Sequence, residues 1–395
     1  AIMALVDDTV PPTLGYTEED LAALAEKAGK LDFVPNKPEK KKLGAVMNNS
    51  FAFGGNNASI IFSKGKGNVP EAPAAKEIAV TGLGLVTPLG NGREAYVAAV
   101  KNGAECGASA ASVIGIPDYD AQGLKMNFYR KLDHLSQLQA VSGMDALHDA
   151  KYEVTDENAT RIGMIVGTSE GALGPSCEFQ SIIAEKGNAG GSAFKFPNTV
   201  YNAAGGYLSI CSGIKGYNVT VTNGAQSGLQ SVAYAMQVIR NGWEDAMLAT
   251  GTDENSEIIS ELYGKLGLVA GEKVRPYDQK KVFSLSDGSV SALLETVDSA
   301  KARGAETLCR VTGYGMAHGS VPFGKVTGSA AGLTAAVEAA LDDAHLTASD
   351  IDAIVGFANG HSALDAAEAE GLSKCFDLSR VPVISVKERA GEGRA

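Results

Sequence analysis

The stretch YNVTVTNGAQSGLQSVAYAMQVIRNGWEDAMLAT, residues 217–250, decides the fold. Its β-branched beginning, Tyr217–Asn223, predicts a buried strand. The apolar spacing of Ala225–Arg240 predicts a helix, and Asp245–Thr250 predicts the next strand. A strand, a helix and a second strand in this order indicate a sheet that is covered by helices.

Ala225 occupies the junction at which the first strand turns into the helix. Backbone amides and the positive end of the helix dipole meet at such a junction, where they lower the pKa of a cysteine. The position is therefore suited to a thiolate nucleophile. In this sequence it holds a methyl group, which cannot attack a carbonyl.

Two pairs of similar strands lie far apart in the sequence. AVTGLG at Ala79–Gly84 resembles RVTGYG at Arg310–Gly315, and IGMIVG at Ile162–Gly167 resembles IDAIVG at Ile351–Gly356. Because helix-like stretches separate these strands, we expect mainly parallel sheets with helices outside them. The repetition predicts a duplicated α/β domain.

The segment KGKGNVPEAPAAK, residues 64–76, has the composition of an exposed linker. It separates a short N-terminal piece, residues 1–63, from a long C-terminal piece. We expect the long piece to contain two halves, residues 77–304 and 305–395.

The charge balance limits the kinds of partner. With 34 basic and 46 acidic residues, the net charge of −12 repels nucleic acid and anionic membranes. No apolar run reaches the roughly 20 residues that span a bilayer, and AIMALVDD does not resemble a signal peptide. The five cysteines have no CxxC spacing, which predicts free thiols, no metal site and a cytoplasmic protein.

Four longer motifs carry a resemblance to a known family. They are KEIAVTGLGLVTPLGNG (76–92), FPNTVYNAAGGYLSICSGIKGYNVTVTNGAQSGLQS (196–231), VRPYDQ (274–279) and NNSFAFGGNNASIIF (48–62). Together they resemble the β-ketoacyl synthases, the condensing enzymes of fatty-acid and polyketide assembly. The resemblance implies a duplicated thiolase-like fold with five layers, αβαβα.

The order of the motifs differs from the order in that family. The Gly-rich loop of residues 51–57 normally comes last, whereas here it precedes the family's opening strand. VPVISVKERAGEG, Val381–Gly393, resembles the segment that should precede Ala1. We therefore expect a circular permutation with the linker as the joint, and the alternative is a slice through two tandem synthase-like domains.

The resemblance also implies where the reactive groups should lie. The family's cysteine matches Ala225, its first histidine matches Asn359 in ANGHS, and its second histidine matches Glu392 in KERAGE. The family's lysine is retained as Lys387. His361 lies two residues after Asn359, where the family usually has threonine, so all three reactive groups are replaced.

Other residues of these motifs have structural as well as functional interpretations. His361 is either a displaced base or, as we expect, a hydrogen-bonded structural residue. We expect Lys387 to pair with Glu392 or a neighbouring carboxylate. Gln226, next to the lost cysteine, is expected to cap the helix or to hydrogen-bond a loop, and the alternative is a role in decarboxylation.

The Gly-rich loop matches the loop that carries the family's gating phenylalanine. Its residues here are Phe51, Phe53, Gly54 and Gly55, and Phe53 matches the gating position. Without a nucleophile behind it, Phe53 is expected to pack a closed pocket. Further along, the acidic residues of Asp365–Glu370 are expected to form a solvated helix face.

This replacement pattern is typical of chain-length factors. Such a subunit pairs with an active ketosynthase and shapes the tunnel for a type II polyketide or aryl-polyene chain. The resemblance implies a ketosynthase partner, acyl carrier protein reached through that partner, and no cofactor beyond the carrier's phosphopantetheine. The alternatives are a stand-alone malonyl-carrier decarboxylase or divergent synthase, and a purely structural subunit.

Overall fold

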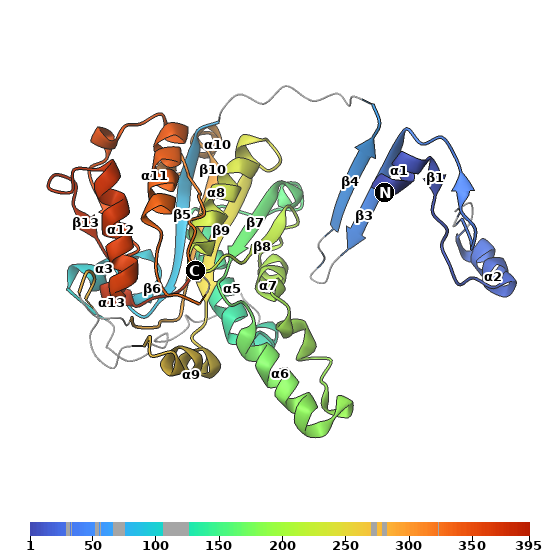
Figure 1. Ribbon diagram of the computed structural model, residues 1–395, viewed down its shortest axis with the longest axis horizontal. Coiled ribbons are helices and arrows are strands. Elements are labelled where there is room, and N and C mark those ends of the chain that lie inside the picture. The colour runs from blue at the N-terminus through green and yellow to red at the C-terminus, as the bar shows by residue number, and fades with distance from the viewer. Residues whose placement is uncertain are drawn as a thin grey trace. The chain divides into compact units, whose positions relative to one another are not determined.

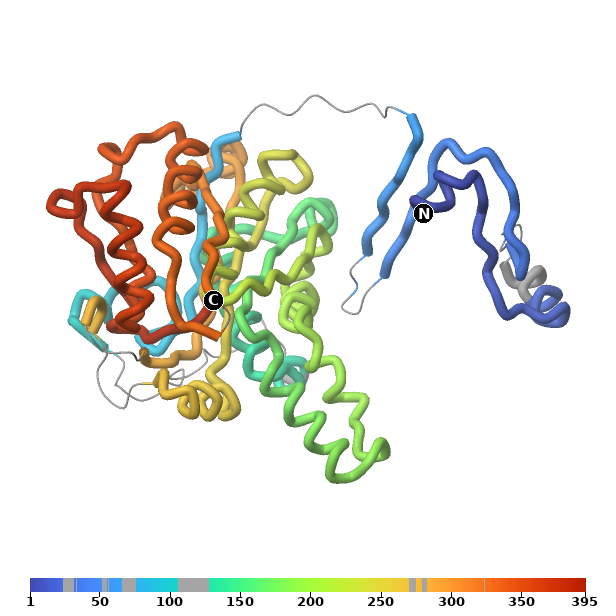
Figure 2. Tube along the Cα trace, viewed as in Figure 1, coloured from blue at the N-terminus to red at the C-terminus, as the bar shows by residue number. Residues whose placement is uncertain are grey.

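The computed structural model describes residues 1–28, 32, 34–51, 55, 57–65, 76–105, 126–269, 275–278, 283–322 and 324–395. The chain divides into two compact units, Ala1–Ala72 and Pro73–Ala395 (Figure 2). We call them unit 1 and unit 2 and describe each by itself. The boundary between them lies inside the segment 64–76.

Unit 1 consists of short helices and two antiparallel strand pairs. Leu5 is the one buried hydrophobic residue among its described residues. Side chains such as Phe51 and Ile61 are exposed on the β3–β4 hairpin, so the described part of unit 1 buries almost no core. The elements are α1 (Ile2–Asp7), β1 (Thr9–Val10), α2 (Glu18–Ala28), β2 (Glu39–Lys40), β3 (Ala45–Phe51) and β4 (Asn57–Ser63).

Unit 2 is built around a mixed sheet in the order β11-β5-β10-β9-β7-β8, with β6 paired to β5. β7 is parallel to β8 and β9, whereas β10 is antiparallel to β9 and β5. The sheet is thus less parallel than the sequence predicts. Its strands are β5 (Ile78–Thr87), β6 (Gly90–Asn91), β7 (Ile162–Gly167), β8 (Asn218–Val221), β9 (Ala246–Asp253), β10 (Gly288–Thr296) and β11 (Cys309–Val311).

Helices cover both faces of this sheet (Figure 1). On one face Met236 and Ile239 of α8 (Ser227–Arg240) pack against Ile165 and Met247. On the other face α5 (His134–Asp149) and α7 (Ala203–Ser212) pack against the alternate strand residues, including Met164 and Leu248. Neighbouring strand positions therefore point into opposite cores, which explains the long apolar runs in β7 and β9.

The duplicated G-x-G motifs have the same packing role in both halves. A Cβ on Gly84 would lie 1.8 Å from the carbonyl oxygen of Ser142 in α5. A Cβ on Gly315 would lie 2.0 Å from the carbonyl oxygen of Ala336 in α11 (Ala330–Ala344). Only glycine allows the two backbones to approach this closely. The repeated motif is therefore explained by a helix that lies against the backbone in each half.

The second half contributes β11 to the main sheet and forms a separate parallel pair, β12 (Ile354–Val355) with β13 (Val383–Ile384). Hydroxyl side chains cap α10 and α11 at Thr296 and Ser329. The remaining elements of unit 2 are α3 (Arg93–Lys101), α4 (Met126–Tyr129), η1 (Ala159–Arg161), α6 (Leu173–Lys186), η2 (Asn188–Gly190), η3 (Phe196–Thr199), α9 (Glu257–Lys265), α10 (Val297–Ala302), η4 (Ala348–Asp350), α12 (Ser362–Cys375) and α13 (Lys387–Ala390).

Candidate functional site

The strand-to-helix junction forms as the sequence predicts. β8 ends at Val221 and α8 begins at Ser227, with Gly224 in the left-handed region at φ 63°. The Ser227 hydroxyl closes the turn by donating to the Gly224 carbonyl at 2.7 Å and accepting from the Asn223 amide at 2.8 Å. Ala225 is exposed at this junction.

Gln226 occupies the N-cap position of α8. Its side chain makes no capping hydrogen bond, so the capping role considered for it is not observed. The side chain is exposed beside Ala225. The turn is held by Ser227 instead.

Glu392 is the centre of a buried polar network. Its Oε2 accepts from Lys387 Nζ at 2.7 Å and from Asn359 Nδ2 at 3.2 Å. Its Oε1 accepts from the Arg394 amide at 3.0 Å, and its side chain is only 4% exposed. The predicted pairing of Lys387 with Glu392 is therefore present, and three of the residues singled out in the sequence lie in one network.

Lys387 has a second partner that fixes its position. Its Nζ lies 3.5 Å from the centroid of the Phe357 ring, over the ring face. The backbone of Glu392 is also held, because its amide donates to Ser284 and its carbonyl accepts from Ser286. The carboxylate thus has a fixed place and a compensated charge.

The loop before α12 holds Asn359 and His361. The Oδ1 of Asn359 accepts from the His361 amide at 3.0 Å, so both ends of the Asn359 amide are engaged. The His361 carbonyl accepts the amides of Leu364 and Asp365, and its side chain is buried. These contacts support the structural interpretation of His361.

Two acidic residues of α12 anchor this loop. Glu368 accepts from the amides of Phe357 and Ala358 at 2.6 and 2.9 Å. Asp365 is buried and accepts from the amide of Gly360 in this loop at 3.4 Å and from the amide of Tyr277 at 2.6 Å. The expectation of a solvated face was therefore wrong for these two residues, because the loop's amides point at them.

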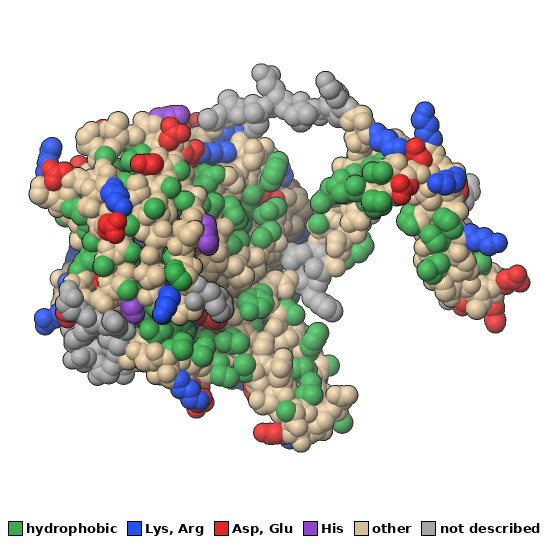
Figure 3. Space-filling view, viewed as in Figure 1, with side chains coloured by type: hydrophobic (Ala, Val, Ile, Leu, Met, Phe, Trp, Pro, Cys, Tyr) green, Lys and Arg blue, Asp and Glu red, His purple; other side chains and the backbone are tan. Residues whose placement is uncertain are grey.

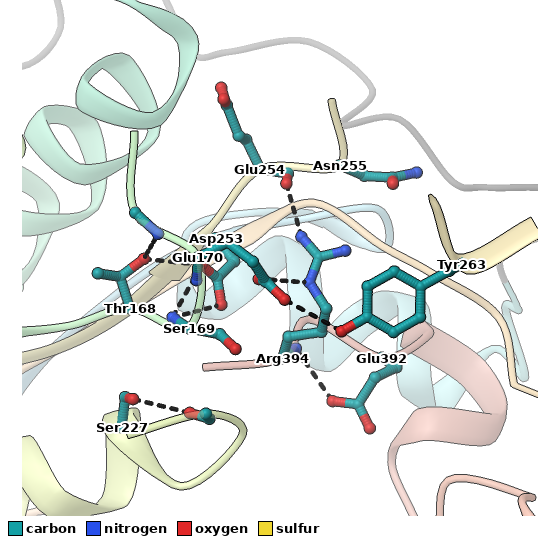
Figure 4. Close-up of polar contacts among 12 residues, drawn as sticks. Thr168, Ser169, Glu170, Ser227, Asp253, Glu254, Asn255, Tyr263, Glu392 and Arg394 are labelled. Atoms are coloured by element: carbon teal, nitrogen blue, oxygen red, sulfur yellow. Dashed lines mark hydrogen bonds and ion pairs between the residues drawn. The ribbon is translucent and has the colours of Figure 1, made fainter. Parts of the chain in front are cut away.

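A second polar cluster, which the sequence reading missed, surrounds Arg394. Its Nε donates to Glu170 Oε2 at 3.0 Å and its Nη2 donates to the Glu254 carbonyl at 2.6 Å (Figure 4). The Tyr263 hydroxyl donates to Glu170 at 3.1 Å. Asp253 accepts from Thr168 Oγ1 at 2.7 Å.

The topology gives a signal by which this cluster could have been found. Residues 168–170 follow β7, Asp253 ends β9 and Glu254 follows it. β7 and β9 are parallel neighbours. Polar residues at the carboxyl ends of parallel strands meet at one edge of a sheet. Burial raises the pKa of Asp253 and of Glu254 to about 7.

The last residues of the chain bring the two regions together. A Cβ on Gly228, in the first turn of α8, would lie 2.9 Å from the carbonyl carbon of Ala395. A Cβ on Gly251 of β9 would lie 3.3 Å from the same atom. Only two residues lie between Glu392 and Ala395, so the junction at Ala225 and the Glu392 network belong to one region of unit 2.

The predicted Gly-rich loop belongs to unit 1. Phe51 ends β3 and is exposed, and Gly55 has φ 83°. Phe53 and Gly54 lie outside the described residues, so the gating assignment stays a prediction.

Of the cysteines that the structure describes, Cys211 has a perturbed and partly buried thiol. Burial raises the pKa of Cys211 to about 11, which makes it a poor nucleophile. In the described parts of the chain, no three His, Cys, Asp or Glu residues are grouped as a metal site would require. Of the helices in those parts, none has the length and apolar character of a bilayer span.

Comparison with known proteins places this geometry in a family. The family described as "Beta-ketoacyl synthase, N-terminal domain" matches residues 108–300, and "Beta-ketoacyl synthase, C-terminal domain" matches residues 308–395. The chain belongs to the β-ketoacyl synthase family. This confirms the family part of the resemblance.

Among curated β-ketoacyl synthases, 3-oxoacyl-[acyl-carrier-protein] synthase 2 of Vibrio harveyi is 29% identical over 352 residues. The match covers 80% of this chain and 81% of that protein. The protein of the same name from Vibrio cholerae is also 29% identical over 352 residues, with 80% and 82% covered.

Solved structures confirm the thiolase-like ketosynthase fold. A β-ketoacyl synthase from Burkholderia phymatum has a TM-score of 0.72 at 24% identity, covering 81% of this chain and 83% of its own. The ishigamide ketosynthase/chain length factor has a TM-score of 0.72 at 22% identity, covering 81% and 82%. At these identities the likeness shows the fold alone.

Proposed function

We propose that this chain is a non-catalytic chain-length-factor subunit. It forms a heterodimer with an active ketosynthase of a type II polyketide or aryl-polyene pathway, and it shapes the tunnel in which the partner elongates the chain. The observation that supports this proposal is that Ala225, Asn359 and Glu392 stand at the three positions that match the family's cysteine and two histidines, in a chain with the ketosynthase fold.

The chemistry of condensation explains why these positions matter. A condensing enzyme holds the growing chain on a thiolate and uses two imidazoles to drive malonyl decarboxylation. Here Ala225 offers no nucleophile. Glu392 places a carboxylate where the family has an imidazole, and a carboxylate disfavours both a malonyl carboxylate and a developing enolate oxyanion.

The edge of the main sheet supports a partner-dependent role. β8 pairs only with β7 among the described strands, so its other edge is unpaired. Hydrophobic side chains gather on the face over α6 and α7 in Figure 3. In the segment from the end of α6 to the start of α8, the exposed hydrophobic residues include Phe194, Tyr201, Ile210 and Leu229. An open strand edge next to apolar surface suits association with another chain.

The names of the curated relatives support the main alternative. The relatives are named 3-oxoacyl-[acyl-carrier-protein] synthase 2, which is the name of a condensing enzyme. The alternative is therefore that this chain is itself an enzyme, either a divergent synthase or a malonyl-carrier decarboxylase, that acts without a ketosynthase partner. A decarboxylase would need Asn359, His361 or Gln226 to act on substrate. The amide of Asn359 is already engaged with Glu392 and His361, which favours the silent subunit.

Purification alone and with a partner separates these functions. We expect the chain alone to leave acyl- and malonyl-carrier protein unchanged, and to form a one-to-one complex with a cysteine-bearing ketosynthase. Turnover by the chain alone would reject the silent-subunit proposal. A tight homodimer that excludes the ketosynthase would support the purely structural alternative.

We also propose that the chain is circularly permuted. Both family matches lie in unit 2, and the curated relatives are covered over about four fifths of their length. Unit 1 contains the segments that resemble the family's end, including the hairpin with exposed apolar side chains. These observations support a displaced C-terminal segment and agree equally with a slice through two tandem domains.

A further inference from the structure

A cavity of about 660 Å³ lies in unit 2 beside α3, β13 and α13. Its volume lies in the range of small-molecule sites. Ala225, Asn359 and Glu392 are not among its lining residues. The cavity is therefore distinct from the positions on which the proposed function rests.

Two guanidinium groups line this cavity. Arg389 of α13 is half-buried, and its Nη1 is buried without a hydrogen-bond partner in the part of the chain that the structure describes. Leaving such a donor unpaired costs free energy. Arg275 is exposed and lines the same cavity, while Glu388 also lines it and has an interaction of its own.

The lining of the cavity also includes a phenol and aliphatic side chains. Burial raises the pKa of Tyr96, and the charge of Arg389 partly offsets this effect, so the phenol and the guanidinium lie close together. The lining also contains the partly exposed apolar side chains of Ile384 and Val386, which are 50% and 43% exposed, and of Val100 in α3. A ligand that satisfies both kinds of lining side chain needs a charged head and an apolar body.

We propose that this cavity binds an amphipathic anion. A phosphate or carboxylate head lies against Arg389 and Arg275, because guanidinium groups bind planar oxyanions through paired hydrogen bonds. An apolar chain lies along Ile384, Val386 and Val100. The site lies outside the replaced catalytic positions and is independent of the chain's role as a partner subunit.

Calorimetric titration of the full chain tests the proposal with octyl phosphate, octanoate, 1-octanol and inorganic phosphate as probes. We expect saturable one-to-one binding of an octyl anion, and binding of the neutral alcohol and of inorganic phosphate that is weaker by about tenfold or more. The two octyl anions distinguish a phosphate head from a carboxylate head. Equal binding of 1-octanol, or no binding of either octyl anion, would overturn the proposal.

Matched variants locate the site. Arg389→Ala should weaken binding by about tenfold, and Arg389→Lys should weaken it less because it keeps a charge but loses the fork. Arg380→Ala removes an exposed guanidinium outside the cavity and should leave binding unchanged. Val386→Glu, at an exposed lining position, should repel the anion without disturbing the core. Unaltered affinity in both Arg389→Ala and Val386→Glu would refute the assignment.

Discussion

Glu392, which matches a histidine of the family by its motif, is held in the buried structure of unit 2. The carboxylate sits between an ammonium, an amide and a backbone N–H, at 2.7, 3.2 and 3.0 Å. Lys387 has only 19% of its side chain exposed, and Glu392 is its ion-pair partner at 2.7 Å. These contacts indicate that Glu392 contributes to the stability of unit 2.

Glu392→Gln should destabilise unit 2, because it leaves the Lys387 ammonium unpaired in a buried setting. We expect a loss of about 3 kcal/mol of unfolding free energy. Urea unfolding can be followed by the fluorescence of Trp243, the single tryptophan. Glu370→Gln removes the surface pair with Lys374 and should cost about 0.5 kcal/mol. If Glu392→Gln and Glu370→Gln lowered the unfolding free energy equally, the stabilising role of the buried Glu392 network would be contradicted.

The buried carboxylates predict how stability depends on pH. Asp253 has a pKa raised to about 7 in the folded chain, whereas an unfolded aspartate titrates near 4. Between these values the folded chain holds a proton that the unfolded chain has released, so unfolding free energy falls as pH rises. The pKa of His134 is raised by its hydrogen bond to Asp287, and its contribution is also lost as pH rises.

Asp253→Asn should flatten this dependence. We expect the unaltered chain to lose about 2 kcal/mol through Asp253 between pH 5 and 7, and the variant to lose correspondingly less. Denaturation midpoints across that range provide the measurement. Asp377→Asn is the control, since Asp377 is exposed and its pKa is lowered by Ser379. A slope unaffected by Asp253→Asn would show that this carboxyl is ionised throughout.

At the scale of elements, close helix–strand packing depends on glycine. Gly84→Ala would place its Cβ against the carbonyl of Ser142, and we expect a loss of about 3 kcal/mol. Gly264→Ala in α9 has open space around the new methyl group and should be neutral or stabilising. Thermal unfolding of both variants tests the contact, and a stable Gly84→Ala protein would contradict it.

The β8 edge gives a prediction about association. The Val221 carbonyl accepts from the amide of Thr168, the residue that follows β7. Thr220, one residue before Val221, therefore directs its amide to the unpaired edge. Thr220→Pro should therefore abolish co-purification with a ketosynthase while leaving the circular dichroism spectrum unchanged. Thr220→Ala keeps the amide and should keep the complex. A Thr220→Pro protein that still binds its partner would place the interface elsewhere.

Much of the element order in unit 2 is predictable from sequence periodicity. Ile162–Gly167 is a strand as predicted, and α8 begins two residues after the predicted start. Tyr217–Asn223 was expected to be buried, but β8 is half-buried because it lies at the sheet edge. Strand order and the anchoring roles of Asp365 and Glu368 depend on contacts between distant segments, which local periodicity does not encode.

Part of the candidate site was also predictable from the sequence, and part was not. The motif residues Asn359, Lys387 and Glu392 were found from their positions in the sequence, and the structure joins them. The Arg394 cluster depends on the meeting of β7 and β9 ends with the last residues of the chain. Sequence spacing alone gives no sign of that meeting.

At the scale of the whole molecule, the proposed permutation makes a direct prediction. A gene that encodes residues 77–395 followed by residues 1–63 should yield a folded protein with the same ketosynthase partner. The reason is that surface termini can be joined without changing the core. Size-exclusion chromatography of the reordered chain, alone and mixed with the ketosynthase, shows whether it is folded and whether it forms the complex. A reordered chain that fails to fold would favour the tandem-domain alternative.

The central claim is that all bond making belongs to a companion protein. Intact-mass analysis of the chain, incubated with acyl- and malonyl-carrier protein with and without a ketosynthase, tests it most directly. We predict no acyl adduct on this chain, no loss of CO₂ from malonyl-carrier protein in its sole presence, and elongation only when the ketosynthase is added. An acyl group attached to this chain, or decarboxylation by it alone, would contradict the account.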